Sequence, residues 1–238
     1  EKEGAWKAKL EEKVPEKVYT SLEQAFCKAF ALVFEKGTGI IEKSYDRDAL
    51  EKDYAVRDFA VQVKGDRRTL RRFPKENRGA NAKNLLLSTV EGVGLGALGI
   101  GLPDIVLFVG MLLKGIYETA LRYGFPYEDP AEQMWILRMM ETALTKGPLW
   151  TEKNQGVDAF LYQGLMEEPT KEALSQQIQA TAQTFAMDML VLKFIQGLPL
   201  VGALGGAANP VYYRRVLNYV QLKYHKRYLY QKRREMAP

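Results

Sequence analysis

Two aspartates stand in apolar stretches of the sequence, where a carboxyl group could serve as a general acid. Asp104 follows a Gly-Leu-Pro step at the start of an apolar run, and Asp188 lies in the largely apolar stretch 185–195. Burial raises the pKa of a carboxyl group, as general acid catalysis requires, so the pair would suit a hydrolase. We favour the alternative, in which Asp104 caps its own helix and Asp188 pairs with a lysine such as Lys193 or Lys114.

Other reactive residue types are scarce. His225 is the only histidine and lies in a basic segment, which weakens any catalytic triad and argues against a histidine-rich metal site. Cys27 is the only cysteine, and it lies on an apolar helical face where we expect a buried, inert thiol. No G-x-x-x-x-G-K-[ST] motif occurs, so the glycines do not form a P-loop. We therefore predict neither a metal nor a cofactor.

Positive charge is concentrated in two segments. The formal net charge is +5, but residues 209–238 hold eight Lys or Arg against one acid, and residues 64–78 hold seven against two. The rest of the chain is therefore net negative. Two basic segments on an acidic body indicate polyanionic partners at those segments.

We expect lipid or anion binding in both basic segments. In the first, four arginines at i, i+1, i+4 and i+5 share one side of a helix, although a solvated connecting helix remains open there. In the second, tyrosines alternate with cations, a composition suited to a membrane interface. The candidate residues are Arg67, Arg68, Arg71, Arg72, Arg214, Arg215, Lys223, Lys226 and Arg227.

Two glycine-rich apolar stretches organise the chain. Residues 92–113 contain six glycines and one formal charge, and residues 195–210 repeat the Gly-Leu-Pro step. Small residues at GxxxG spacing let two backbones approach closely. The glycines at this spacing are Gly92, Gly96, Gly202 and Gly206. The stretches either pack the centre of a helical bundle, which we favour, or insert into a membrane; the apolar run after Asp104 is too short to cross a bilayer alone.

Apolar residues recur at three- and four-residue spacing along most of the chain, and no segment shows strand alternation with hairpin turns. The sequence therefore predicts an all-α fold: a single compact bundle of about eight helices with the two glycine-rich helix breaks packed centrally. Helices are expected over residues 18–34, 46–63, 104–123, 130–144, 151–166, 170–196 and 210–234, of which the one over 151–166 is the least clearly marked.

Two of these helices have faces that we expect to point inward. The inward residues of the helix over 46–63 are predicted to be Leu50, Tyr54, Phe59 and Val63. Those of the last helix are predicted to be Tyr213, Leu217, Val220, Tyr224 and Tyr228, with the cations spread over the remaining surface.

Four segments of the sequence resemble the EcsC family. They are GLGALGIGLPD at residues 94–104, ALRYGFPYEDPAE at 120–132, IQGLPLVGALGGAANPVYYRRV at 195–216 and KRYL at 226–229. Two glycine-rich blocks in this order, with the R-Y-G step and the final R-Y-L, make the resemblance fairly specific. It divides the chain into a charged N-terminal lead-in (1–15), an EcsC-like helical domain (16–229) and a basic C-terminal tail (230–238).

The resemblance implies a bacterial, helix-rich protein whose namesake is encoded beside the ATPase and membrane subunits of an ABC transporter. It supplies no established reaction and no agreed catalytic residues, so no active site is carried over. The chain opens with neither a signal peptide nor a methionine, so the natural N-terminus is left open.

Our leading hypothesis is a non-enzymatic protein, peripheral at the inner face of the bacterial cell membrane, that binds anionic lipid or a membrane protein complex such as an ABC transporter. Cations near anionic headgroups contribute about 1 kcal/mol each. The alternatives are the hydrolase described above and, ranked last, nonspecific nucleic-acid binding, which no helix-turn-helix, zinc or RNP-like motif supports. The sequence does not predict an oligomeric state.

Overall fold

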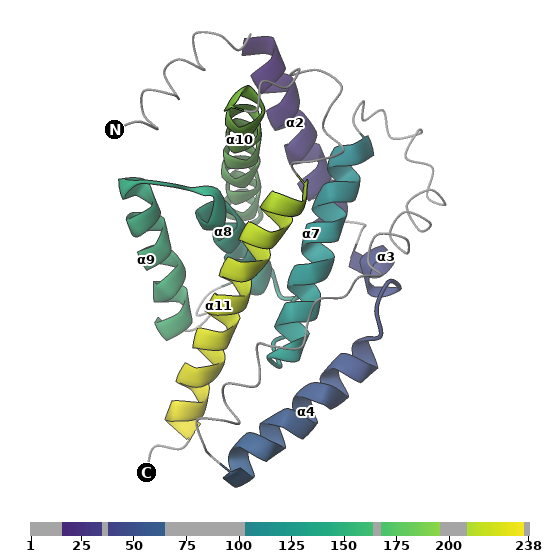
Figure 1. The fold of residues 1–238 in the computed structure, drawn as a ribbon, viewed down its shortest axis with the longest axis vertical. Coiled ribbons are helices and arrows are strands. Elements are labelled where there is room, and N and C mark those ends of the chain that lie inside the picture. The colour runs from purple at the N-terminus through teal and green to yellow at the C-terminus, as the bar shows by residue number, and fades with distance from the viewer. Residues whose placement is uncertain (1–15, 35–37, 65–102, 164–167, 196–208, 236–238) are drawn as a thin grey trace.

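All regular elements that the structure describes are helices (Figure 1). The structure is a computed structural model, and it describes residues 16–34, 38–64, 103–163, 168–195 and 209–235. The helices are α2 (Glu16–Leu32), α3 (Thr38–Glu42), α4 (Arg47–Lys64), α7 (Pro103–Arg122), α8 (Pro130–Leu144), α9 (Pro148–Gln163), α10 (Lys171–Ile195) and α11 (Asn209–Glu235). Apart from the five-residue α3, the described part thus holds seven long helices. The predicted all-α class is confirmed.

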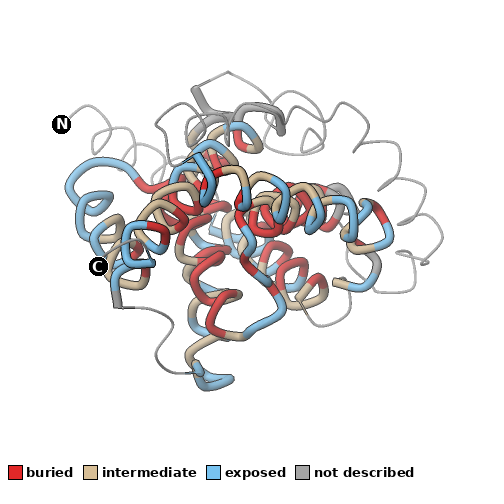
Figure 2. The backbone as a smooth tube through the Cα atoms, turned by 90° about the horizontal axis from the view of Figure 1, so that it is seen from below, coloured by how far each residue is buried: buried red, intermediate tan, exposed pale blue. Residues whose placement is uncertain are grey.

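The helices form a compact bundle around α7, α8 and α11. α11 packs against α7, α8 and α9, while α10 packs between α2 and α8. α4 packs mainly against α7 and lies at the lower edge of the molecule in Figure 1. In Figure 2, which views the molecule from below, buried positions gather in the middle and exposed positions lie towards the outside.

α8 begins and ends at the predicted residues. Asp129 caps its N-terminus, because the aspartate side chain accepts a hydrogen bond from the backbone N–H of Ala131. Pro130 occupies the first turn, where its missing N–H costs nothing. Nearly every residue of α8 is buried, since α9, α10 and α11 cover it on different sides. The methionine- and tryptophan-rich sequence is thus core filling.

Close approach of α7 and α11 depends on Gly115. A Cβ atom added at this position would lie 2.8 Å from Leu217 Cδ1 and 2.8 Å from the hydroxyl of Tyr213. Only a residue without a side chain leaves room for these two side chains of α11. The four glycines predicted to pack helices closely, Gly92, Gly96, Gly202 and Gly206, lie outside the described residues. The predicted central packing of the glycine-rich breaks stays a prediction.

The predicted inward face of α4 is wrong in its second half. Phe59 and Val63 are exposed, whereas Asp58 and Val61 are buried. The buried face continues from Tyr54 at three- and four-residue steps, but through a charged side chain that an apolar pattern passes over. α11 compensates this burial with the hydroxyl of Tyr228, which donates to Asp58 at 2.8 Å.

The predicted stripe of α11 is confirmed. Val220, Tyr224 and Tyr228 are buried, and the other two residues of the stripe are half-buried. Tyr212 and Val216 are buried as well and extend the stripe along the helix. Among the helices that the structure describes, none combines the length and apolar composition needed to cross a bilayer.

Candidate functional site

Ion pairs join α11 to four other helices. Each pair sets a cation of α11 against a carboxylate from elsewhere in the fold. The pairs are Lys232 with Asp58 of α4, Arg227 with Glu132 of α8, Lys223 and Lys226 with Asp158 of α9, and Arg215 with Asp188 of α10. We call this set the α11 ion pairs. Most of the lysines and arginines of α11 are therefore paired with acids of the same chain.

The most buried of these carboxylates is Glu132, whose side chain is 2% exposed. Arg227 Nη1 donates to both of its oxygens, and the Tyr224 hydroxyl donates to Oε1 at 2.7 Å. The guanidinium also lies over the rings of Phe125 and Trp135, 4.1 and 5.1 Å from their centroids. Burial raises the pKa of Glu132. Arg227 and Tyr224 act to lower it, but the effect of burial is larger.

Asp158 bridges two lysines of α11. Lys223 Nζ lies 2.7 Å from one carboxylate oxygen, and Lys226 Nζ lies 2.9 Å from the other. Lys223 is buried and also donates to the Asn154 side chain at 2.8 Å. Burial acts to raise the pKa of Asp158, but the hydrogen bonds from both lysines outweigh it and set the pKa below its ordinary value. This site is structural, since both oxygens of the carboxylate already accept from cations.

Three exposed cations lie in the last turns of α4 and α11. Lys64, Arg233 and Arg234 are exposed, and none of them has an ion pair with another described residue. Lys232, next to Arg233 in the chain, links α11 to α4, because its Nζ lies 2.8 Å from Asp58, six residues before Lys64. We call Lys64, Arg233 and Arg234 the basic end. All three belong to the basic segments of the sequence, but none of them was predicted as a site residue.

The segments that carry the family resemblance contact each other in the structure. Glu132 and Phe125 belong to segment 120–132, and their partner Arg227 belongs to segment 226–229. The model of the EcsC protein family matches residues 1–229. The chain belongs to the EcsC family. Protein EcsC of Bacillus subtilis (strain 168) is 24% identical over 204 residues, which are 84% of this chain and 75% of that protein. No solved structure matches the chain significantly.

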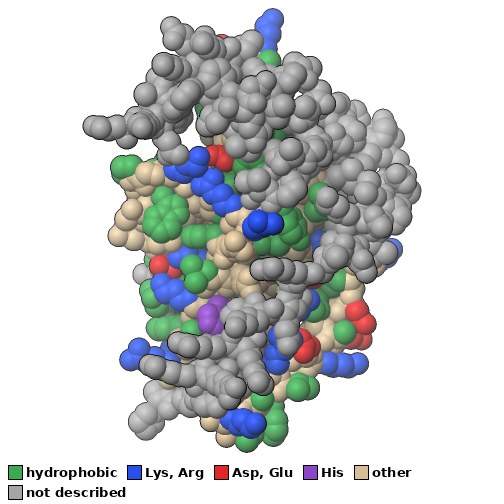
Figure 3. Space-filling view, viewed as in Figure 1, with side chains coloured by type: hydrophobic (Ala, Val, Ile, Leu, Met, Phe, Trp, Pro, Cys, Tyr) green, Lys and Arg blue, Asp and Glu red, His purple; other side chains and the backbone are tan. Residues whose placement is uncertain are grey.

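Five of the nine cations predicted to bind anions in this EcsC-family chain are described by the structure. Arg67, Arg68, Arg71 and Arg72 lie outside the described residues. Four of the others take part in the α11 ion pairs, and Lys223 among them is only 4% exposed. Arg214 is exposed and has no ion pair among the described residues. On the face seen in Figure 3, lysine and arginine side chains occur in separate groups among hydrophobic ones.

The cations of α11 were expected to form an exposed surface, but most of them are paired with acids, and the reason is physical. The acids that neutralise it come from distant parts of the EcsC-family chain, so a local charge count reports the cations without their partners. An anionic ligand at Lys223 or Arg227 would have to displace a carboxylate that is already bound there. The exposed basic end faces no such competition from the described residues.

Asp188, one of the two predicted acids, is also part of the α11 ion pairs. Its carboxylate lies 3.4 Å from Lys146 and 3.6 Å from Arg215. The expected partner Lys114 lies elsewhere: its Nζ donates to the backbone carbonyl of Ser44 at 2.5 Å, 3.6 Å from Glu118. The side chain of the other predicted acid, Asp104, lies outside the described residues. Asp188 thus lies between two cations.

A tyrosine cluster lies between α3, α7 and the segment before α8. Tyr127 stacks on Tyr117 with ring centroids 4.0 Å apart, and its hydroxyl donates to Glu42 at 2.7 Å and lies 2.5 Å from that of Tyr45. Burial raises the pKa of Tyr45 to about 12 and raises that of Tyr127 as well. Acid–base catalysis works best with a pKa near the working pH, so these shifts move the tyrosines away from it.

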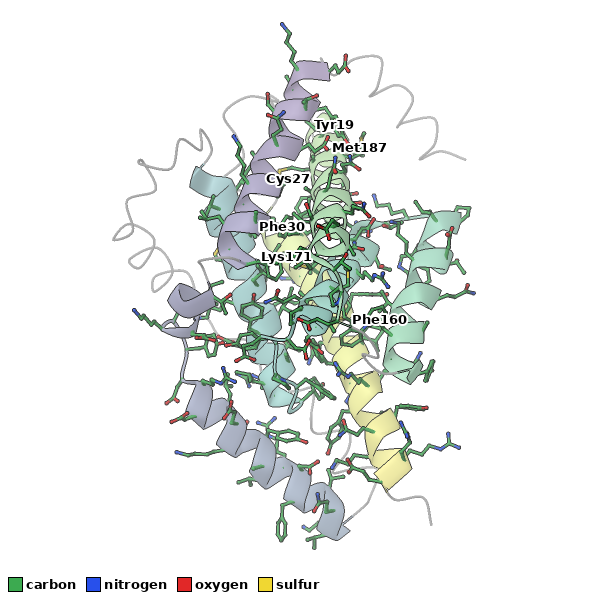
Figure 4. All side chains as sticks on the ribbon, turned by 180° about the vertical axis from the view of Figure 1, so that it is seen from behind. Tyr19, Cys27, Phe30, Phe160, Lys171 and Met187 are labelled. Carbon is green, nitrogen blue, oxygen red and sulfur yellow. The ribbon has the colours of Figure 1, made fainter. Side chains whose placement is uncertain are left out.

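The single cysteine and the single histidine occupy packed positions. Cys27 lies on α2 beside α10, close to Phe30 (Figure 4). Cys27 is half-buried and not fully buried as predicted, but burial, with a smaller contribution from Glu23, raises the pKa of its thiol, as expected for an unreactive cysteine. Burial lowers the pKa of His225. Within the described ranges, no three His, Cys, Asp or Glu side chains are grouped so that they could hold a metal ion.

Proposed function

We propose that this EcsC-family protein is a non-enzymatic protein that binds the anionic surface of the cytoplasmic membrane from its inner side. The observation that supports the proposal is the basic end. Lys64, Arg233 and Arg234 are exposed in the last turns of α4 and α11, and Lys232 links these two helices through Asp58 while it also pairs with Glu235. Anionic headgroups suit this arrangement because a lipid surface presents many negative charges to several exposed cations at the same time.

The energetics favour a multivalent surface over a single small anion. Each cation near an anionic bilayer contributes about 1 kcal/mol, so three contribute roughly 3 kcal/mol. This binding free energy is smaller than the one that corresponds to a millimolar Kd. Arg67, Arg68, Arg71 and Arg72 follow Lys64 closely in the chain and would add charge of the same sign. Contributions of this size give reversible, salt-sensitive attachment, as expected for a peripheral protein.

Co-sedimentation with lipid vesicles tests the proposal. We expect the full chain to sediment with phosphatidylglycerol-containing vesicles, to remain in solution with pure phosphatidylcholine, and to bind more weakly at high salt. Reversal of the basic end in the variant K64E/R233E/R234E should weaken binding at least tenfold. Arg215, Lys226 and Arg227 are left unchanged, because reversing them would break the α11 ion pairs and confuse binding with folding.

The matched control is Arg214→Glu. Arg214 is exposed on the same helix, about 30 Å from Arg234 at 1.5 Å per residue, so this substitution changes the net charge away from the basic end. Because the sequence also predicted Arg214 to bind anions, the variant separates that prediction from binding through the basic end. Binding by R214E should be close to that of the wild type. Equal binding to neutral vesicles, or full binding by the triple variant, would contradict the proposal. Binding only to membranes that contain protein would assign the contact to a membrane protein complex instead.

A further inference from the structure

α4 presents a row of apolar side chains to solvent. Val56, Phe59 and Val63 are 69%, 67% and 65% exposed. They lie at i, i+3 and i+7, a spacing that places them on one face of the helix. We call them the α4 stripe. Exposure of two valines and a phenylalanine in one row is uncommon without a partner, because single exposed apolar residues are usually scattered.

The opposite face of α4 fixes the direction in which the stripe points. Val61 is buried in the core, Tyr54 packs edge-on against Tyr228 with ring centroids 6.4 Å apart, and Asp58 accepts hydrogen bonds from Tyr228 and Lys232. Rotation of the helix to bury the stripe would expose Val61 and separate Asp58 from its cation. The stripe therefore stays outside in the folded chain.

Charges around the stripe favour an anionic partner. Lys52 and Lys64 lie on either side of it along the helix, and both are exposed with no ion pair among the described residues. Two nearby acids, Glu51 and Asp53, are paired with arginines of the same helix, Arg47 and Arg57. Lys64 of the basic end follows Val63 of the stripe directly in the chain, so one cation of the basic end lies beside the stripe.

We propose that the α4 stripe inserts into the headgroup region of an anionic bilayer, with α4 lying in the plane of the membrane and Lys52 and Lys64 at the headgroups. The inference rests on the proposed membrane function and adds the element that enters the bilayer. Amphipathic helices with apolar residues between cations bind membranes in this way. α4 lies at the edge of the molecule, where a flat surface can reach it (Figure 1).

The size of the stripe favours a bilayer over a second copy of the chain. A stable protein–protein interface buries about 800 Å² on each partner, and three side chains fall well short of that area. A bilayer needs no matching surface, because the acyl chains adapt to whatever apolar groups enter. Insertion also adds a component of binding that salt does not screen, whereas the basic end supplies only the screened component.

Binding of the full chain to vesicles of phosphatidylglycerol and phosphatidylcholine tests the stripe. We expect F59S/V63S to bind at least tenfold more weakly than the wild type and to lose the binding that persists in the wild type at 0.5 M salt. Both residues are exposed, so the variant should keep the circular dichroism spectrum and Tm of the wild type. Leu222→Ser is the matched control, because Leu222 is an exposed apolar residue on α11 outside the stripe.

A fluorescent label gives an independent readout. Cys27 is the only cysteine, so C27A/F59C can be labelled at position 59 with an environment-sensitive dye. Its emission should shift to shorter wavelength with anionic vesicles and stay unchanged with neutral ones. The same label in C27A/L222C should show no shift with either.

The outcomes separate this inference from the proposed function. If the wild type binds no anionic vesicles, the proposed function fails, and the inference fails with it. If the wild type binds but F59S/V63S binds equally well and the label at position 59 does not shift, the stripe is not inserted, while attachment through the basic end stands. If the stripe instead mediates dimerisation, seen as a concentration-dependent mass that F59S/V63S abolishes, its occupant is a second copy and the inference is overturned.

Discussion

Nη1 of Arg227 lies 2.7 and 3.0 Å from the two carboxylate oxygens of Glu132. This pair joins segment 226–229 to segment 120–132, two of the segments on which the family resemblance rests. The side chains have a structural role, since the guanidinium is also held by the rings of Phe125 and Trp135. Packing thus joins two of the family's recognisable segments.

Arg227→Ala should be strongly destabilising. Removing one partner of a buried ion pair leaves the other charge uncompensated, at a cost of about 3–5 kcal/mol. Urea denaturation measures the loss. In the double variant E132Q/R227M, no charge is left buried, so its loss of stability should be smaller than the sum for the single variants. If the losses of stability of the two single variants add up to that of the double variant, the two side chains are not coupled.

Gly124→Ala should destabilise the chain more than Gly147→Ala. Both glycines have positive φ, 77° and 65°, so alanine costs about 1 kcal/mol or more at either position. At Gly124 a Cβ atom would also collide with the ring of Tyr54, which packs α4 onto the body, whereas nothing lies within 4 Å of a Cβ at Gly147. Thermal unfolding of both variants measures the difference. Equal shifts in Tm would indicate that Tyr54 moves aside freely.

Gly156→Ala should stabilise the protein. Gly156 lies inside α9 and is exposed, and an added Cβ would meet nothing within 4 Å. Alanine is favoured over glycine in a helix interior by about 1 kcal/mol because it restricts the unfolded chain. Urea denaturation should show a higher midpoint with an unchanged slope. A lower midpoint would mean that this turn of α9 is not an ordinary helix.

Asp158→Asn should alter the pH dependence of stability. The pKa of Asp158 is lowered in the folded state, so its contribution is fully present above the unfolded pKa of about 3.9 and is lost as pH falls through the folded value. We expect D158N to be less stable than the wild type at pH 7, with the difference shrinking below about pH 4. Glu152→Gln, which changes an exposed acid of the same helix, is the control. A difference independent of pH would contradict the assignment.

Local sequence signals predicted the helices well. The bounds of α8 follow from Asp129, Pro130 and the Gly147-Pro148 step, and α10 begins where the Thr170 hydroxyl accepts from the backbone N–H of Ala173. Capping and helix-breaking residues act within one turn of their position, so the sequence displays them directly.

Interactions between distant residues were not predictable in the same way. Asp58 is buried because Tyr228 and Lys232 bind it from 170 and 174 positions further along the chain. An apolar pattern therefore assigned the wrong face to α4, and a charge count treated paired cations of α11 as exposed. Glu132 was missed for the same reason, because the residues that bind it are distant in the chain.

The carboxylates that bind α11 precede it in the chain, and this order has a consequence for synthesis. α4, α8 and α9 emerge from the ribosome while the lysines and arginine that will neutralise Asp58, Glu132 and Asp158 are still untranslated. The nascent chain cannot bury these acids favourably before α11 is synthesised, so we expect its helices to remain loosely packed and hydrated until then. A ribosome stalled before residue 209 should therefore present a protease-sensitive chain, and folding of the domain completes only when its last helix is released.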